Sequence, residues 1–268
     1  MKSQIISASR RSDIPAFYGD WFMQQIKAGY CEVANPFNPK QVNRIQLSLA
    51  AVDCFVFWTK YPISLLPPLP KLQKMGYPFY FLFTLNAYNT TFESQLPSLP
   101  KRIEMFQKIS SLIGNKRIVW RYDPIIISQQ SGIGFHLRSF LRIANSLKGY
   151  TNKVIISFYD DYAKTRKRLQ NYKIVKNVLA LTELPDFLRN LKQIAIDNGL
   201  KIQSCCDRLP NIKQDSCIDS ELIEEISERR ISKVKDTGQR KNCLCAQSRD
   251  IGTYNTCRFA CEYCYAIK

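Results

Sequence analysis

The sequence predicts an α/β fold, a partial or complete TIM-like (β/α) barrel, from two observations. Short apolar, β-branched or aromatic runs alternate with segments of helical periodicity, and parallel strands need such crossover helices between them. The chain has 268 residues, a length typical of one α/β barrel, and 45% of them are hydrophobic, enough for a sizeable core.

The predicted strands and helices follow one another in a regular order. Six strands are expected, over residues 5–9, 52–59, 78–85, 117–122, 153–159 and 200–206. Three helices carry an apolar stripe and stop at a glycine, over residues 100–114, 135–149 and 185–199. Elsewhere we expect a hairpin or loop insertion over 31–47, a Pro-rich loop over 65–72 and a short helix over 219–231.

Polar or reactive residues stand at the end of each predicted strand. They are Arg10, Arg11 and Asp13; Thr59 and Lys60; Thr84, Asn86 and Tyr88; Arg121 and Asp123; Asp160 and Tyr162; and Cys205. Strands end in polar residues in any protein, but in a barrel of parallel strands these ends converge on the face where active sites lie. Six such endings in a row therefore favour a shared site.

Acid–base chemistry at that site would fall to carboxylates and phenols. The single histidine, His136, begins a helix, so we expect a structural role for it. The candidates for proton transfer are Asp13, Asp123, Asp160, Tyr122 and Tyr162.

The net charge is +17, from 39 Lys and Arg against 22 Asp and Glu. Such a charge favours anionic partners, including nucleic acid and phosphorylated or carboxylated small molecules. The basic residues are spread along the chain, however, which is equally typical of a solvated Lys-rich surface. The N-terminal residues become polar after two isoleucines and no apolar stretch approaches the length of a membrane span, so we expect no signal peptide and a soluble, cytoplasmic protein.

Ten cysteines are present, and eight of them lie in the last quarter of the chain. The sequence therefore divides into an α/β barrel over residues 1–206 and a Cys-rich C-terminal tail over residues 207–268 that packs on it. Cys31 and Cys54 stand apart and are expected to be small buried residues. In a reducing compartment disulfides are disfavoured, so clustered cysteines indicate metal.

Cys257, Cys261 and Cys264 have the spacing C-x3-C-x2-C. Three thiolates on one loop can hold three corners of a [4Fe–4S] cluster and leave the fourth iron open. The alternative is a structural zinc site, which needs four ligands and could be completed by Cys243 and Cys245.

A second set of cysteines precedes this motif. Cys205, Cys217, Cys243 and Cys245, with Cys206 as a substitute for Cys205, could hold a second four-Cys cluster. The spacings of this set are irregular, so the signal is weaker than that of the terminal motif.

The terminal stretch YNTCRFACEYCYA resembles the signature of radical S-adenosylmethionine (SAM) enzymes, and that of spore photoproduct lyase and related DNA-repair enzymes in particular. Tyr263 stands where that superfamily usually has an aromatic residue near the adenine. The resemblance implies that the open iron binds the amino and carboxylate groups of SAM. It further implies cleavage of SAM to methionine and a 5′-deoxyadenosyl radical, with a reductant protein of the flavodoxin or ferredoxin type as partner.

The resemblance also gives roles to the residues at the strand ends. Arg11, Asp13, Arg121 and Asp123 would position SAM or substrate through charge-assisted hydrogen bonds, and Asp13 and Tyr263 would contact the cofactor. The substrate would be a small molecule or a nucleic acid. The rival interpretation is a non-enzymatic barrel, stapled by zinc or a cluster, that binds nucleic acid through its basic surface.

The chain as a whole resembles the domain-of-unknown-function family 1848. The resemblance is carried by SASRRSDIPAFY, NPFNP, FWTK, WRYDPI, ISFYDDY, SCCDR, CID, GQRKNCLC and DIGTYNTCRFACEYCYA. That family is uncharacterised and is described as radical-SAM-like because of its terminal Cys motif. Its Ser-Cys-Ala-Glu element aligns its Cys with Cys205, so Cys206 and Asp207 depart from the pattern.

The position of the motif predicts a rearranged chain order. In ordinary radical SAM enzymes the three cysteines follow the first strand, whereas here they lie at the end of the sequence. We therefore expect a circular permutation of the radical SAM barrel, with residues 250–254 running beside residues 5–9. The three sulfurs should then lie near Arg11, Asp13 and Arg121.

Overall fold

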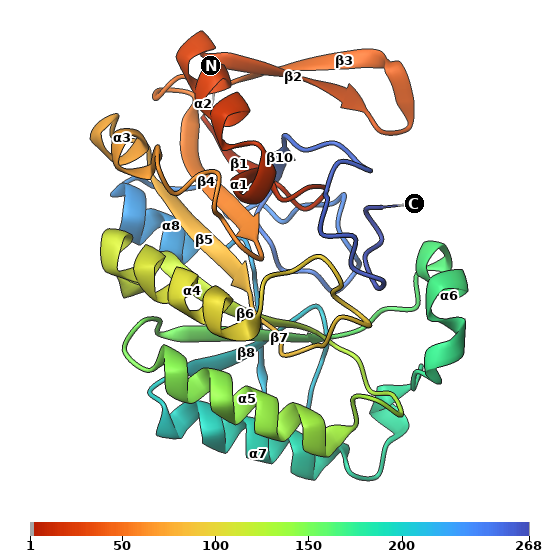
Figure 1. Ribbon diagram of the computed structural model, residues 1–268. Coiled ribbons are helices and arrows are strands. Elements are labelled where there is room, and N and C mark those ends of the chain that lie inside the picture. Colours follow the sequence, from red (N-terminus) through yellow and green to blue (C-terminus); the bar gives the residue numbers. More distant parts are fainter. Residues whose placement is uncertain (1–2, 268) are drawn as a thin grey trace.

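The computed structural model describes residues 3–267, and its centre is a parallel sheet of eight strands (Figure 1). The strand order is β10-β1-β4-β5-β6-β7-β8-β9, and every neighbouring pair is parallel. The strands are β1 (Gln4–Ala8), β4 (Val52–Thr59), β5 (Phe79–Thr84), β6 (Ile118–Ile125), β7 (Lys153–Phe158), β8 (Lys201–Cys205), β9 (Lys213–Asp215) and β10 (Ser248–Asp250). The predicted α/β class is confirmed. Within residues 3–267 no strand pairing joins β10 to β9, so closure into a barrel stays a prediction.

Eight α-helices are present in the described residues. They are α1 (Ile14–Phe17), α2 (Gly19–Ala28), α3 (Leu69–Lys74), α4 (Leu99–Ile113), α5 (Ile133–Leu147), α6 (Ala163–Leu169), α7 (Leu184–Asp197) and α8 (Ser220–Ser227). The three helices predicted from apolar stripes are confirmed as α4, α5 and α7. The loop predicted over residues 65–72 is wrong from Leu69 onward, where α3 begins. Its prolines lie at and just before the start of this helix, a position where the missing N–H of proline is tolerated. The helix predicted over 219–231 ends at Ser227, and Glu228 takes a left-handed conformation.

The sheet is covered on both faces. One face carries an aromatic core that includes Phe55, Phe57 and Phe81, with the rings of Phe57 and Phe81 5.0 Å apart. Helices α4, α5 and α7 pack in a row along this side (Figure 1). The other face, which includes Val56 and Leu82, is covered by the C-terminal region. Burial on both faces explains why the central strands are continuous apolar runs rather than alternating ones.

The segment between α2 and β4 forms the predicted hairpin. Strands β2 (Tyr30–Asn35) and β3 (Asn38–Gln46) pair antiparallel as a separate two-stranded sheet. The hairpin projects from the body of the molecule (Figure 1), and Phe37 at its tip is 95% exposed.

The C-terminal region supplies both edge strands, β9 and β10. Strand β10 runs parallel to β1, with Ile5 opposite Ser248 and Ser7 opposite Asp250. The amide of Ile251 continues the pairing with a 3.0 Å hydrogen bond to the carbonyl of Ser7. The chain that enters the terminal Cys motif therefore lies beside the first strand, as the permutation hypothesis requires.

None of the helices within residues 3–267 combines the length and the apolar character that a bilayer crossing needs.

Candidate functional site

A cavity of about 500 Å³ opens at the carboxyl ends of the parallel strands. Its lining includes Arg11, Asp13, Arg121, Asp123, Tyr263, the cysteines of the terminal motif, and Cys205, Cys206, Cys217, Cys243 and Cys245. Asn86 and Tyr88, which follow β5 and were expected at the same site, are not among the lining residues. Asp160 and Tyr162 line it as well. The strand ends thus converge as expected, and the structure brings both cysteine sets to the same cavity.

Tyr122, a candidate for proton transfer, lies elsewhere. Its side chain is buried in the core, and its hydroxyl lies 2.8 Å from Nδ1 of His136. The other ring nitrogen of His136 lies 3.0 Å from the carbonyl of Ile126, and burial lowers the pKa of the imidazole to about 4. Adjacent residues of a strand point to opposite faces, so Arg121 reaches the cavity while Tyr122 does not. The predicted structural role of His136 fits this placement, and Tyr122 is excluded from the cavity.

Asp250 joins the terminal loop to the end of β1. Its carboxylate accepts hydrogen bonds from the hydroxyls of Ser7 and Ser9, at 2.9 and 2.6 Å, and from the amide of Arg10, at 2.8 Å. It also accepts from the amide of Gly252, at 2.9 Å. One carboxylate therefore fixes the direction in which the chain leaves β10 for the Cys motif.

The terminal loop, residues 255–266, is closed by a 2.9 Å hydrogen bond from the amide of Asn255 to the carbonyl of Ala266. Asn255 and Ala260 take positive φ angles of 62° and 48°, which turn the backbone sharply. The loop docks on the first helical segment, where the Tyr18 hydroxyl donates to the carbonyl of Thr256 at 2.6 Å. These contacts hold the three cysteines over the end of the sheet.

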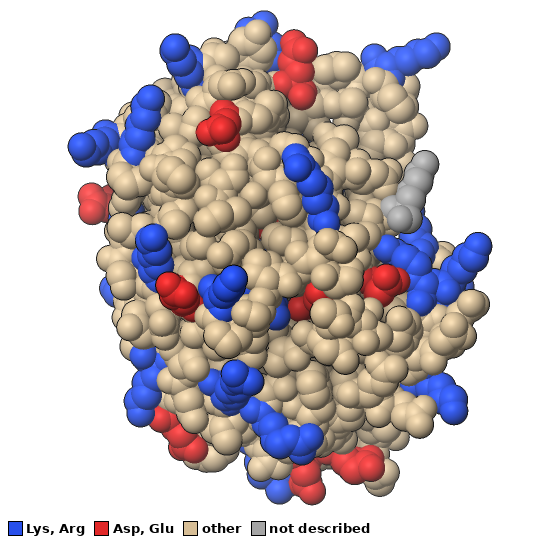
Figure 2. All heavy atoms as spheres, in the orientation of Figure 1, with Lys and Arg blue, Asp and Glu red and all other residues tan. Residues whose placement is uncertain are grey.

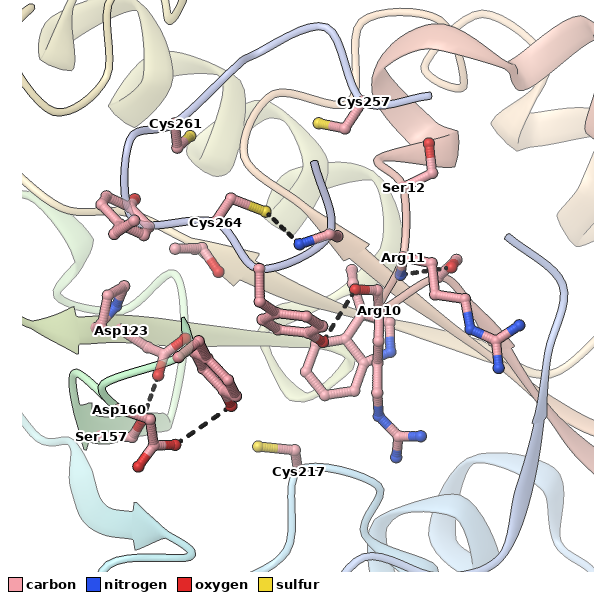
Figure 3. A pocket seen from close by; sticks show the side chains of 18 of the residues that line it. Arg10, Arg11, Ser12, Asp123, Ser157, Asp160, Cys217, Cys257, Cys261 and Cys264 are labelled. Carbon is pink, nitrogen blue, oxygen red and sulfur yellow. Dashed lines mark hydrogen bonds between the residues drawn. The ribbon is translucent and has the colours of Figure 1, made fainter. Parts of the chain in front are cut away.

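The three thiols of the loop face the cavity from one side (Figure 3). Cys261 is buried, whereas Cys257 and Cys264 are partly exposed. Burial raises the pKa of Cys257 to about 11 and also raises that of Cys261, where the charge of Lys60 opposes it. Within residues 3–267 no group of three or more His, Cys, Asp or Glu side chains is arranged so that it could hold a metal ion. The three thiols thus line a common space at the end of the sheet.

A buried ion-pair network that the sequence did not indicate lies beneath the loop. Glu93 is bound by Nζ of Lys60 at 2.9 Å and by Nη1 of Arg102 at 3.1 Å. Burial alone would raise the pKa of Glu93, but the charges of Lys60 and Arg102 lower it below its ordinary value. The hydroxyl of Tyr263 donates to Glu93 and accepts a 2.7 Å hydrogen bond from Lys60. Glu93 stands in no recognisable sequence motif. The only member of the network that the sequence singled out is Lys60, as a charged residue at the end of a predicted strand.

Tyr263, expected to contact the cofactor, is therefore held by its hydroxyl in this network. Its ring packs 5.9 Å from the ring of Tyr88, centroid to centroid. The contacts place Tyr263 as an anchor for the loop between Cys261 and Cys264.

Asp13 is also fully engaged. One carboxylate oxygen caps α1 by accepting from the amide of Ala16 at 3.0 Å, and the other accepts from the amide of Lys60 at 2.7 Å. Burial raises the pKa of Asp13 to about 6, despite these hydrogen bonds. Asp13 thus connects the end of β1 to the end of β4 beneath Cys257.

The wall between the two cysteine sets carries arginines stacked on an indole. The guanidinium groups of Arg10 and Arg121 lie 5.3 and 4.8 Å from the ring centroid of Trp58. Arg121 also pairs with Asp123 at 2.7 Å, and Asp123 accepts a short hydrogen bond from the hydroxyl of Ser157. Although burial opposes its charge, Asp123 and nearby cysteines raise the pKa of Arg121 above its ordinary value.

Arg11 belongs to the outer part of the wall. Its guanidinium lies over the ring of Tyr254, 5.4 Å from the centroid, and its amide is bonded to Ser9. Arg10 and Trp58 were not assigned a role from the sequence. The position of Arg10 at the end of a predicted strand could have indicated a role for it. Nothing in the sequence around Trp58 indicates one.

Comparison with known proteins gives a family but no activity. No curated protein matches the chain. Among solved structures, a candidate alpha-L-fucosidase from Bacteroides thetaiotaomicron VPI-5482 shares 12% identity, over 85% of this chain and 83% of that chain. The TM-score of that match is 0.31, too low to support an argument about fold or function. The family described as "Domain of unknown function (DUF1848)" matches residues 5–266, nearly the whole chain, and this protein therefore belongs to that family.

Proposed function

We propose that this protein is a radical SAM-type enzyme, with a [4Fe–4S] cluster on Cys257, Cys261 and Cys264 and SAM bound in the adjoining cavity. One observation carries the proposal. The terminal loop, far from β1 in the sequence, lies at the carboxyl end of β1 in the same cavity as Arg11, Arg121 and Asp123.

The residues of the loop fit a cluster by the chemistry of their donors. Three thiols are the soft ligands that iron–sulfur clusters take, and a three-thiol loop leaves one iron for another ligand. No fourth cysteine lies within the loop itself. Metal binding would displace thiol protons, and burial raises the pKa of Cys257 and of Cys261, so loading should become more favourable as the pH rises.

When bound, the cluster would supply the electron that cleaves the sulfonium bond of SAM to methionine and a 5′-deoxyadenosyl radical. Around it, Asp13 and Asp250 would act as positioning residues. The carboxylate of each accepts hydrogen bonds from backbone amides near the terminal loop and so fixes the chain there. Arg11 and the Arg121–Asp123 pair would orient the anionic and hydroxyl groups of SAM or substrate. A flavodoxin- or ferredoxin-type protein would deliver the electron.

The dimensions of the cavity and the distribution of charge favour a small substrate over nucleic acid. A volume of about 500 Å³ lies within the usual range of small-molecule sites. On the face seen in Figure 2, Lys and Arg are scattered and interspersed with Asp and Glu, without a continuous basic stripe. Nucleic-acid binding is the rival, and it would weaken steeply with rising salt through counterion release.

The test is anaerobic reconstitution with iron and sulfide, followed by incubation with dithionite and SAM. The expected result is a brown protein that forms 5′-deoxyadenosine, with both properties lost in Cys257→Ala, Cys261→Ala and Cys264→Ala. Cys31→Ala is the matched control, because Cys31 is buried in the hairpin and lies outside the cavity lining. A colourless zinc protein that binds nucleic acid at low salt and leaves SAM intact would replace the proposal by its rival.

A further inference from the structure

Five thiols that lie far apart in the sequence meet in one place in the fold. Cys205 ends β8 and Cys206 follows it, Cys217 follows β9, and Cys243 and Cys245 precede β10. All five are buried. All five belong to one buried cluster and line the cavity, and the sulfurs of Cys205 and Cys206 lie 3.9 Å apart.

Packing by itself does not account for this arrangement. A buried cysteine behaves as a small apolar residue and needs no thiol neighbours, as Cys31 shows in this same chain: it is buried in the main core cluster, whose other described residues include no cysteine. Here the backbone is turned toward sulfur as well. The amide of Ile218 donates to the sulfur of Cys245 at 3.3 Å, and the amide of Ala246 bonds the carbonyl of Ile218 at 3.0 Å. N–H donors directed at sulfur are a feature of metal-bound thiolates.

The charges beside the thiols point to an anionic centre. The side chain of Arg10 is only 14% exposed, its nearest carboxylate oxygen, on Asp236, is 3.7 Å away, and its Nη2 has no hydrogen-bond partner in the described residues. Arg121 pairs with Asp123, and its Nε likewise has no partner among the residues described. Both arginines line the same cavity as the cysteines of this set. Beside neutral thiols the guanidinium of Arg10 would be only partly compensated by Asp236, whereas thiolates around a metal would supply negative charge.

We propose that Cys205, Cys217, Cys243 and Cys245 hold a second metal centre of four thiolates, separate from the cluster of the terminal loop. Cys206 is the extra thiol, because four ligands complete either a [4Fe–4S] cluster or a zinc ion. In the described residues these thiols are not arranged so that they could hold a metal ion, so metal binding would need them to move as well as to lose their protons.

This centre lies across the cavity from the proposed SAM site. Figure 3 shows Cys217 on the side opposite Cys257, Cys261 and Cys264, with Arg10 between them, and all five residues line the same cavity. The centre would also tie residues 236–250, which contain few apolar side chains, to the end of β8. It does not depend on the radical SAM proposal, since either centre can exist without the other.

The test uses the full chain with the three terminal cysteines replaced by alanine. After anaerobic purification and reconstitution, metal and acid-labile sulfide are measured per chain. The expected result is retention of one centre, about four iron and four sulfide for a cluster or about one zinc for a zinc site. Adding Cys217→Ser to this variant should bring the metal to background, whereas adding Cys206→Ser should leave it unchanged.

Two results would overturn the inference: metal at background in the terminal variant while it remains folded by circular dichroism, or metal unaffected by Cys217→Ser. If the terminal variant does not fold, wild-type protein answers the question, because a second centre adds to the terminal cluster either about four further iron or about one zinc per chain. The outcomes separate the two proposals. If the terminal variant keeps metal but forms no 5′-deoxyadenosine, the result bears on the proposed cluster of the terminal loop. If Cys217→Ser then removes the remaining metal, that result bears only on the second centre.

Discussion

Gly252 is the position at which one added methyl group should separate the terminal loop from β1. A Cβ atom at Gly252 would lie 2.0 Å from Oγ and 2.5 Å from Cβ of Ser9, distances that real Cβ contacts do not reach. The φ angle of Gly252 is not positive, so alanine can adopt its backbone conformation. The conflict in Gly252→Ala is therefore steric only. Ser9 can move only by giving up its 2.6 Å hydrogen bond to Asp250.

The magnitude follows from the cost of overpacking. Inserting one methyl group into a packed site costs about 1–3 kcal/mol, which for a chain of this size lowers the melting temperature by about 2–10 °C. Because Asp250 also fixes Arg10 and the start of the loop, Gly252→Ala should reduce iron bound to the terminal motif more than it reduces stability.

The assay combines thermal unfolding followed by circular dichroism with iron content after reconstitution. Gly238→Ala is the matched control, since its Cβ would approach only a carboxylate oxygen of Asp236, at 3.3 Å. Ser9→Gly should restore both properties in the Gly252→Ala background by making room. A Gly252→Ala protein with unchanged melting temperature and iron content would refute the proposed packing of the loop against β1.

Three further changes test separate parts of the structure. Burial lowers the pKa of His136 from an ordinary 6.5 to about 4 in the folded protein. As the pH falls, His136 therefore takes up its proton first in the unfolded chain, and the free energy of unfolding should drop by about 2 kcal/mol between pH 6.5 and 5. A His136→Asn variant with the same pH profile in denaturant unfolding would contradict this. Glu93→Gln leaves two buried cations without a counter-charge and should cost about 3–5 kcal/mol, against under 1 kcal/mol for Glu225→Gln in an exposed ion pair. Equal unfolding midpoints for these two variants would rule out the network. Phe37→Ala, at the exposed hairpin tip that lines the cavity, should change stability by less than about 0.5 kcal/mol but raise the SAM concentration needed for half-maximal turnover. An unchanged concentration would show that the tip does not cover the ligand.

Local sequence patterns identified most of the regular elements. The run over residues 52–59 is β4 residue for residue, and α4 ends directly before the predicted Gly114. These elements carry their periodicity and their end signals within a few residues, so they can be read without knowledge of the rest of the chain. Helix α3 was missed because its prolines resemble a loop, and β9 and β10, with three residues each, are too short for any periodicity.

The sequence by itself also determined the chemistry available: two groups of thiols near the end of the chain, and charged residues at successive strand ends. Only the tertiary structure decided which of them meet. It placed β10 beside β1, brought Cys205 and Cys245 together, and put Glu93 under Tyr263, contacts that span 40 to more than 240 positions in the chain. Such contacts depend on packing between distant segments and on the burial of opposite charges, and no pattern within a short window of sequence encodes either of them.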